Sequence, residues 1–162
     1  MEQLGIHHPA ELGFQLGFGA VVGNDGSIAV DEPTPTAKAD RSVVYVAVRD
    51  DGVVLKVGQT AATLWRRWRP ALVVLDATRP IQIRSNELMD RNRFQEAARG
   101  RRFEVWFKQA LTTSLRYIPG FQYEASLREA EEVYLDRYYE PILGRLLEGR
   151  ASMKGAEQPN PR

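Results

Sequence analysis

Residues 43–60, VVYVAVRDDGVVLKVGQT, constrain the fold of this chain more than any other stretch. Two short apolar runs lie on either side of Asp51-Gly52, a dipeptide that favours a tight two-residue turn. The runs are rich in valine, which is typical of strands. This stretch therefore predicts an antiparallel β-hairpin.

The register of this hairpin decides which side chains share a face. With a two-residue turn, Tyr45 pairs with Gly58 and Ala47 with Lys56, so these four residues lie on one face. Five apolar side chains then lie on the other face, namely Val44, Val46, Val48, Leu55 and Val57, whereas a one-residue slip would mix polar and apolar side chains on both. We therefore expect Tyr45 and Lys56 to lie diagonally across the strands, with roughly 7–8 Å between their Cα atoms.

The remaining periodicity predicts an α+β fold, with a small three-stranded, mainly antiparallel sheet flanked by helices. A third strand is expected where apolar and polar residues alternate, in residues 103–109. Helices are expected over residues 61–69 (capped by Thr60), 86–99 (between Ser85 and Gly100) and 124–140.

The predicted domain organisation has three parts. Residues 1–42 form an N-terminal extension, with a possible hairpin over 17–30 and an extended, proline-containing linker. Residues 43–148 form the main domain, which carries an arginine-rich insertion over 70–102, and residues 149–162 form a small, polar tail.

Composition excludes some classes of protein. The 162 residues include no cysteine, which excludes a disulfide scaffold or a thiolate metal site and fits a reducing compartment. The chain shows neither a signal peptide nor an apolar run long enough to cross a membrane. We therefore expect a cytoplasmic protein with no membrane partner.

Charge is distributed unevenly along the chain. From residue 66 to 102 there are ten arginines against four acids, whereas residues 124–148 hold seven acids against three arginines. A basic segment suits the phosphates of double-stranded DNA, although both segments could equally be solvated faces. The candidate phosphate contacts are Arg66, Arg69, Arg91, Arg93, Arg99, Arg101 and Arg102.

Two helical residues stand out against their apolar stripes. In the first helix, Arg67 lies at the edge of the stripe and could reach the face of Tyr45 and Lys56. In the last helix, the apolar stripe comprises Leu127, Ala130, Tyr134 and Tyr138, and Glu131 falls inside it. A carboxylate on a buried stripe is costly unless it pairs with a cation or binds a metal, so an ion pair with a basic side chain is the alternative for Glu131.

Together these motifs resemble a GIY-YIG nuclease domain over roughly residues 43–145. Val43-Val44-Tyr45 and Lys56-Val57-Gly58 resemble the two motifs that name the family. Residues 64–67 resemble its Leu-x-x-Arg helix, and residues 131–144 resemble its glutamate helix and the Pro-x-x-Asn ending. Two departures are Lys56 in place of a tyrosine and Gly144 in place of the asparagine.

The resemblance implies hydrolysis of a phosphodiester with Mg²⁺ or Mn²⁺. It implies Tyr45 as general base, assisted by Lys56, because a free phenol has a pKa near 10. Arg67 would stabilise the charge of the transition state, and Gln59 could bind the water or a phosphate. Glu131 would anchor the metal, with Glu132 as the alternative, which counting back from Pro141 favours.

The predicted function is therefore a metal-dependent DNA endonuclease of restriction, defence or mobile-element type. It acts on double-stranded DNA and is a possible homodimer, since one centre cuts one strand. Two alternatives stay open: a catalytically inactive DNA-binding module of the same fold, and a protein-interaction domain that uses the acidic last helix and its tyrosines.

Overall fold

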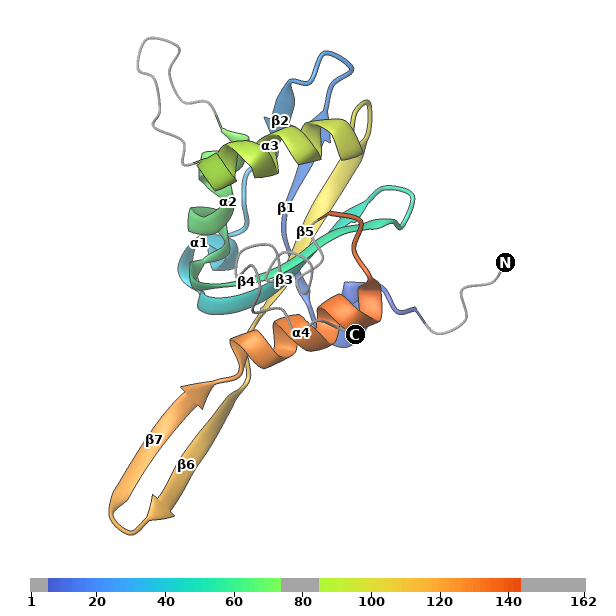
Figure 1. The fold of residues 1–162 in the computed structure, drawn as a ribbon. Helices are drawn as coiled ribbons and strands as arrows, with labels where there is room; N and C mark the ends of the chain where they lie inside the picture. Colours follow the sequence, from blue (N-terminus) through green and yellow to red (C-terminus); the bar gives the residue numbers. More distant parts are fainter. Residues whose placement is uncertain (1–5, 74–84, 144–162) are drawn as a thin grey trace.

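The structure is a computed structural model of the chain, which describes residues 6–73 and 85–143. It is an α+β fold built on a five-stranded antiparallel sheet with the order β2-β1-β5-β3-β4 (Figure 1). The strands are β1 (Gln15–Val22), β2 (Ile28–Val30), β3 (Arg41–Arg49), β4 (Val54–Thr63) and β5 (Arg102–Gln109).

The predicted α+β class and mainly antiparallel sheet are confirmed. The three expected strands are β5, β3 and β4, which are adjacent in the sheet. The expected N-terminal hairpin forms as β1 and β2 around a turn at Gly26. Its strand β1 pairs with β5, so this hairpin extends the main sheet from three strands to five.

The β3–β4 hairpin has the predicted register at the positions of interest. Tyr45 lies opposite Gly58, and Ala47 lies opposite Lys56. The turn, however, differs from the two-residue turn that we expected. The N–H of Arg49 donates to the carbonyl of Val53 at 2.8 Å. This hydrogen bond closes a three-residue loop, and the last residue of the loop is Gly52 with φ +88°.

A β-bulge restores the register between this turn and the site. Val48 pairs with Val54 while Ala47 pairs with Lys56, so Leu55 is the extra residue. The bulge brings Leu55 into the core on the Tyr45 side of the sheet, rather than the opposite side as predicted. The carbonyls of Val54 and Leu55 both accept hydrogen bonds from the chain after the last helix, which a regular strand does not allow for consecutive residues.

The helices differ from the prediction mainly at their starts. They are a short 3₁₀ helix (Pro9–Leu12), α1 (Pro35–Ala39), α2 (Leu64–Leu72), α3 (Ser85–Ala97) and α4 (Arg128–Tyr139). The predicted extended linker contains α1, because Thr34 caps it and Pro35 is tolerated in a first helical turn. Thr63 rather than Thr60 caps α2, since β4 continues further than expected. None of the described helices is long and apolar enough to cross a membrane.

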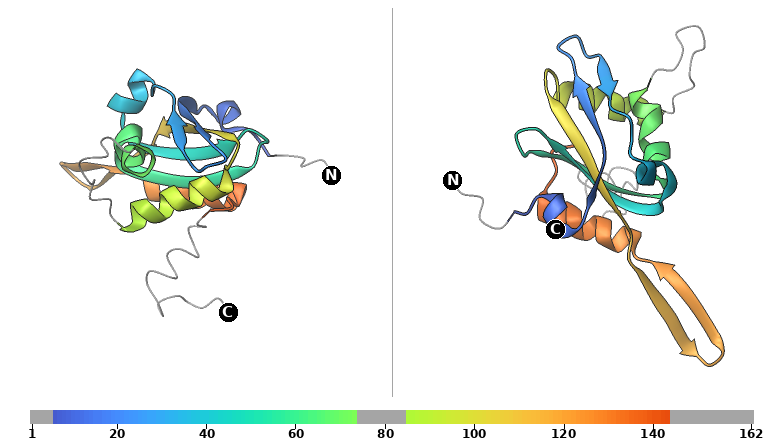
Figure 2. Two further views of the ribbon diagram at one scale, coloured as in Figure 1. Left: turned by 90° about the horizontal axis from the view of Figure 1, so that it is seen from above. Right: turned by 180° about the vertical axis from the view of Figure 1, so that it is seen from behind.

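The sheet is covered on both faces. Helices α1, α2 and α3 cover the face that carries Tyr45, and their core includes Leu64, Trp68 and Phe94. The other face packs against α4 through Leu135 and Tyr139. Figure 2 shows these helices on opposite sides of the twisted sheet. Tyr45 is therefore a core residue, not a side chain on a solvated face.

A two-stranded arm projects from the body between β5 and α4 (Figures 1 and 2). It consists of β6 (Thr112–Ile118) and β7 (Phe121–Ser126), joined by a turn at Gly120 with φ +78°. The sequence predicts no regular element for most of this segment and a helix for its last residues. We call β6 and β7 the arm.

Candidate active site

Tyr45, Lys56 and Arg67 line one shallow pocket. They come from three different elements, β3, β4 and α2. Trp68, Ala71 and Phe94 complete the lining. The sequence-based expectation that Arg67 reaches the face of Tyr45 and Lys56 therefore agrees with the structure.

Packing fixes the Tyr45 side chain tightly. Its ring packs edge-on against Trp68, with 5.5 Å between the ring centroids, and the residue is 1% exposed. A Cβ atom at Gly58 would lie only 2.3 Å from the Tyr45 hydroxyl oxygen. The glycine opposite Tyr45 is thus required because the phenol occupies the space of a side chain.

Helix α2 begins so that Arg67 and Trp68 point to the pocket. The hydroxyl of Thr63 accepts a hydrogen bond from the N–H of Arg66 at 3.2 Å, which caps the first turn. Trp68 is buried, and its indole Nε1 finds no hydrogen-bond acceptor among the described residues.

Helix α4 buries a different face from the one predicted. Tyr134, from the predicted core stripe, is 71% exposed, and Ala130 is exposed as well. The buried residues are instead Glu132, Leu135, Asp136 and Tyr139. The helix is rotated about its axis by roughly one residue, or 100°, relative to our expectation.

Glu131 lies on the face of the sheet opposite Tyr45. Its carboxylate pairs with Lys108 Nζ at 2.8 Å and accepts a hydrogen bond from the N–H of Leu111 at 2.7 Å. Lys108 is paired with Val44 in the sheet, and neighbours along a strand alternate in direction, so Lys108 and Tyr45 point to opposite faces. The ion pair was the alternative that the sequence left open for Glu131.

Glu132 lies on the side of α4 that faces β4. At the start of α4, Arg128 Nε donates to Gln59 Oε1 at 3.0 Å. Just after its end, the N–H groups of residues 142 and 143 bind the start of β4. The helix therefore runs antiparallel to β4. Glu132, one turn after Arg128 and 8% exposed, is level with the part of β4 that carries Lys56.

Arg128 links the start of α4 to β3 and β4, a contact that the sequence did not predict. It bridges Gln59 and Ser42, because its Nη1 also donates to the Ser42 Oγ at 3.0 Å. The guanidinium thus positions the side chain that directly follows Gly58. Arg128 and Glu132 are four residues apart, so helical periodicity puts them on the same face of α4. This spacing is the sequence feature that could have predicted the contact.

The predicted DNA-contacting arginines divide into two groups. Four have structural partners: Arg101 pairs with Asp50, Arg102 with Asp31, Arg99 donates to the Asn24 carbonyl, and Arg91 donates to carbonyls at the end of α2. Arg66, Arg69 and Arg93 are exposed and form no ion pair within the described part of the chain. Only the second group is available for phosphates without breaking a structural contact.

Charges also stabilise the turn of the hairpin. A hydrogen bond from Arg49 holds the pKa of the Asp51 carboxyl well below its usual range, and the charges of Arg49 and Arg101 add to the effect. Arg49 binds both carboxylate oxygens of Asp51 at 2.8 Å. This pair fixes the turn that sets the hairpin register.

Glu132 has the chemistry of a ligand for a hard divalent cation. It supplies carboxylate oxygens from a well-packed helix, which suits Mg²⁺ or Mn²⁺. No group of three or more histidine, aspartate or glutamate side chains with the geometry of a metal site occurs in residues 6–73 and 91–143. Gly144 lies outside the described residues.

Comparison with known proteins supports the fold. No family model matches the sequence, and no curated protein matches it. Among solved structures, the chain is similar to a glutamate-to-alanine mutant of bacteriophage T4 EndoII, with 16% identity, a TM-score of 0.54, and coverage of 83% of this chain and 97% of that one. It also matches a restriction endonuclease in complex with product DNA, with 14% identity, a TM-score of 0.47, and coverage of 82% and 77%. The chain thus shares its α+β fold with EndoII.

Proposed function

We propose that this protein is a divalent-metal-dependent DNA endonuclease with a GIY-YIG-like active site. The observation that carries the proposal is the convergence of Tyr45, Lys56 and Arg67 on one pocket, from three different elements. The fold shared with EndoII supports the same conclusion. The chemistry is hydrolysis of a phosphodiester bond in double-stranded DNA.

Each pocket side chain has a role that its chemistry suits. The Tyr45 oxygen accepts the proton of the attacking water as general base, and the Lys56 ammonium favours the charged phenolate. The Arg67 guanidinium binds the non-bridging phosphate oxygens, where negative charge increases in the transition state.

Glu132, rather than Glu131, is the proposed metal-binding carboxylate. Glu131 is held by Lys108, whereas Glu132 lies on the side of α4 toward β4, the edge strand that carries Lys56. A bound Mg²⁺ or Mn²⁺ would supply Lewis-acid stabilisation of the phosphate and the leaving oxygen. Arg128 donates to Gln59, which pairs with Val44 and therefore points away from the Tyr45 side of β4, so we assign Gln59 a contact with α4 rather than a role in the pocket.

Cleavage of supercoiled plasmid tests the proposal. Wild-type protein should nick or linearise the plasmid with Mg²⁺ or Mn²⁺ and should be inactive with EDTA. Glu132→Ala should abolish cutting, and the matched Glu131→Ala variant should retain it, because the Glu131 carboxylate is engaged by Lys108. Tyr45→Phe should lose the contribution of a general base, about 10²- to 10⁴-fold.

The opposite outcomes have distinct meanings. Cutting that survives in Glu132→Ala but not in Glu131→Ala would show that Glu131 binds the metal. It would refute the assignment of Glu132, which rests on the orientation of α4. Absence of cutting by wild-type protein on several DNAs, with binding retained, would favour the inactive DNA-binding module. The replacement of the family asparagine by Gly144 is the feature of the sequence that favours this second function.

A further inference from the structure

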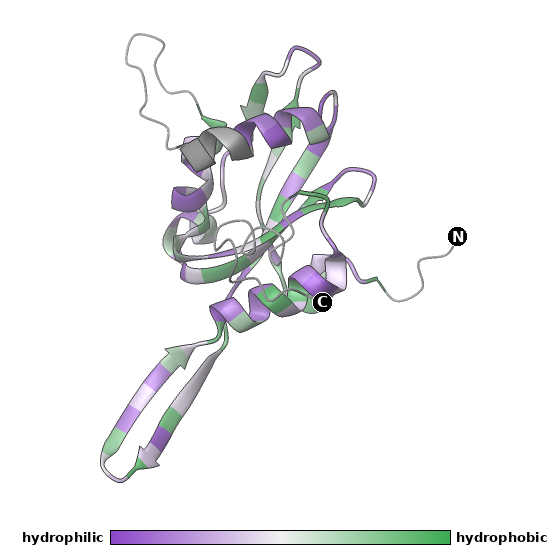
Figure 3. Ribbon diagram, in the orientation of Figure 1, coloured by the Kyte–Doolittle hydropathy of each residue, from purple (hydrophilic) through white to green (hydrophobic). Residues whose placement is uncertain are grey.

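The arm has one apolar face. Leu115 lies opposite Tyr123 and Ile118 lies opposite Phe121, and the register shift in β6 between these two pairs lets the four side chains share a face. The other face carries polar residues such as Glu124, which accepts a hydrogen bond from Gln122. Figure 3 shows hydrophobic and hydrophilic residues side by side along both strands. The arm is thus an amphipathic ribbon.

Nothing in the described chain covers this apolar face. Leu115, Ile118, Phe121 and Tyr123 are 47–61% exposed, and Tyr117 near the tip is 86% exposed. An isolated two-stranded ribbon is at best marginally stable in water unless its apolar face is packed. The arm therefore needs a packing partner beyond the residues that the structure describes.

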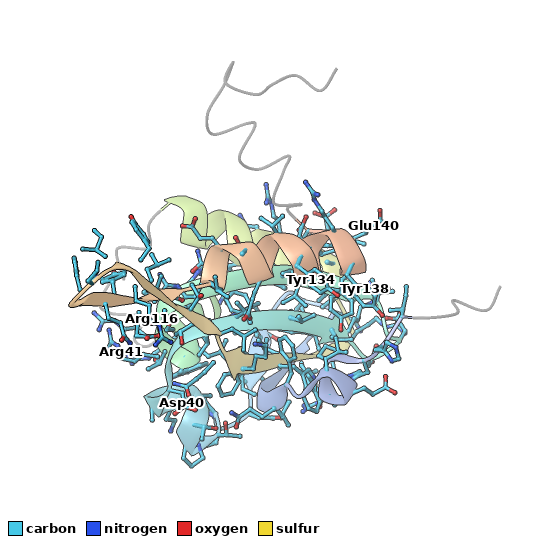
Figure 4. The ribbon with its side chains drawn as sticks, turned by 90° about the horizontal axis from the view of Figure 1, so that it is seen from below. Asp40, Arg41, Arg116, Tyr134, Tyr138 and Glu140 are labelled. Carbon is cyan, nitrogen blue, oxygen red and sulfur yellow. The ribbon has the colours of Figure 1, made fainter. Side chains whose placement is uncertain are left out.

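A second exposed apolar surface begins at the base of the arm. On α4, Leu127, Ala130 and Tyr134 form a stripe that our sequence analysis expected to be buried, but Ala130 and Tyr134 are exposed. We call these three residues the outer stripe; Figure 4 shows Tyr134 and the arm residue Arg116 in the view from below. Leu111 is 59% exposed and accepts a hydrogen bond from the N–H of Leu127, so it joins the arm to the outer stripe.

The chemistry of the two surfaces favours protein over DNA as their partner. The arm carries one cation, Arg116, and one anion, Glu124, so it brings no net charge to a phosphate backbone. Contacts with duplex DNA depend on neutralising phosphates with lysine and arginine. Exposed leucine, isoleucine and aromatic side chains instead match the apolar centre of a protein interface.

The area of these surfaces favours a second copy of the chain. The three exposed rings of the arm offer roughly 300–500 Å², taking 150–250 Å² for a fully buried ring. That is short of the ~800 Å² per partner in a standard interface. Under a two-fold axis, however, each copy contributes both an arm and an outer stripe, and Leu111 and Tyr134 bring the apolar area per copy towards that value.

We infer that the protein forms a two-fold dimer in which the arm of each copy packs its apolar face on the outer stripe of the other copy. Each arm then covers the outer stripe of the other copy, so both exposed surfaces of both copies are buried. Such a symmetric interface leaves no surface for a third copy. The inference does not depend on the proposed nuclease activity, because it rests on exposed apolar side chains alone.

Cross-linking between copies tests the contact directly. The chain has no cysteine, so single cysteines report specific proximity. A mixture of a tagged Phe121→Cys copy with an untagged Tyr134→Cys copy should yield the mixed disulfide dimer under mild oxidation. The control mixture replaces Phe121→Cys with Val21→Cys, which is also on an exposed apolar residue but at the far end of β1. Equal yields from the two mixtures would overturn the arm-to-stripe contact.

Sedimentation without DNA or metal tests the dimer itself. Wild-type protein should dimerise below about 100 µM, and both Tyr123→Glu and Tyr134→Glu should raise the dissociation constant at least about tenfold. Circular dichroism should show an unchanged fold, since both residues are exposed. A monomeric wild type, or a dimer that both variants leave intact, would overturn the inference. An arm that instead binds duplex DNA as a monomer would also overturn it and assign the arm to the nucleic acid.

Discussion

At the scale of single residues, the pocket depends on Tyr45, whose ring occupies the space that a side chain at position 58 would need. The ring of Tyr45 fills the space above Gly58, and Trp68 packs against its other side. The glycine of this motif therefore serves packing in this chain, and its backbone has no need of a positive φ. The same packing holds the phenol oxygen in one position, as a general base requires.

Replacing Gly58 with alanine tests this packing. The new Cβ would lie 2.3–2.8 Å from three atoms of the Tyr45 ring and hydroxyl, so the ring must move. We expect Gly58→Ala to lower the free energy of unfolding by about 1–3 kcal/mol in a denaturant titration. It should also reduce activity, because Tyr45 leaves its position.

A double-mutant cycle provides the control for this prediction. In a Tyr45→Ala background the clash is absent, so Gly58→Ala should cost much less than it does in the wild type. Equal costs in both backgrounds would show that Tyr45 does not impose the glycine.

At the scale of secondary-structure elements, the arm and the body are separable. The arm is exposed over nearly all of both strands, whereas β3, β4 and β5 are buried by helices on both faces. The stability of the body therefore resides in the five-stranded sheet and its two cores. The arm adds an interaction surface to this framework.

Shortening the arm tests that separation. Replacing residues 113–125 by a two-residue turn that joins Thr112 to Ser126 removes strand residues that are exposed, apart from the half-buried Ser114 and Ala125. We expect the free energy of unfolding of the monomer to change by less than about 1 kcal/mol, measured in dilute solution by urea denaturation. Loss of cooperative unfolding would show that the arm belongs to the folding unit.

At the scale of the whole molecule, the arginines form two groups: those that pair with acidic residues of the fold and those that are exposed to solvent. Arg101 and Arg102 bind acidic residues and join the β3–β4 turn and β2 region to β5, whereas Arg66 and Arg69 extend from α2 into solvent. Net charge alone does not distinguish these groups, because both lie in the same arginine-rich part of the sequence.

Two double variants distinguish these two groups. Arg66→Ala/Arg69→Ala should weaken binding to duplex DNA of any sequence and flatten the plot of log K against log salt by about 1.8, or about 0.9 for each phosphate that is no longer neutralised. Arg101→Ala/Arg102→Ala should instead lower the melting temperature and change the slope little. The reverse pattern would place the DNA on the side of Arg101 and Arg102.

The sequence alone determined the features that depend on local periodicity. Alternation with period two determined the β3–β4 hairpin and the pairing of Tyr45 with Gly58, although the turn is one residue longer than the Asp-Gly dipeptide predicted. Helical periodicity placed Arg67 at the edge of the α2 stripe, beside the pocket. The α+β class followed from the same patterns, because each element buries one face against its neighbours.

Only the tertiary structure decided the features that depend on which partner each surface meets. Tyrosines suit both buried and exposed positions, so the periodicity of α4 did not show that Tyr134 faces solvent while Glu132 faces β4. The bulge at Leu55, the pairing of β1 with β5 and the projection of the arm likewise result from contacts between segments far apart in the chain. Local sequence carries no record of such contacts, because their free energy depends on the packed arrangement of the whole chain.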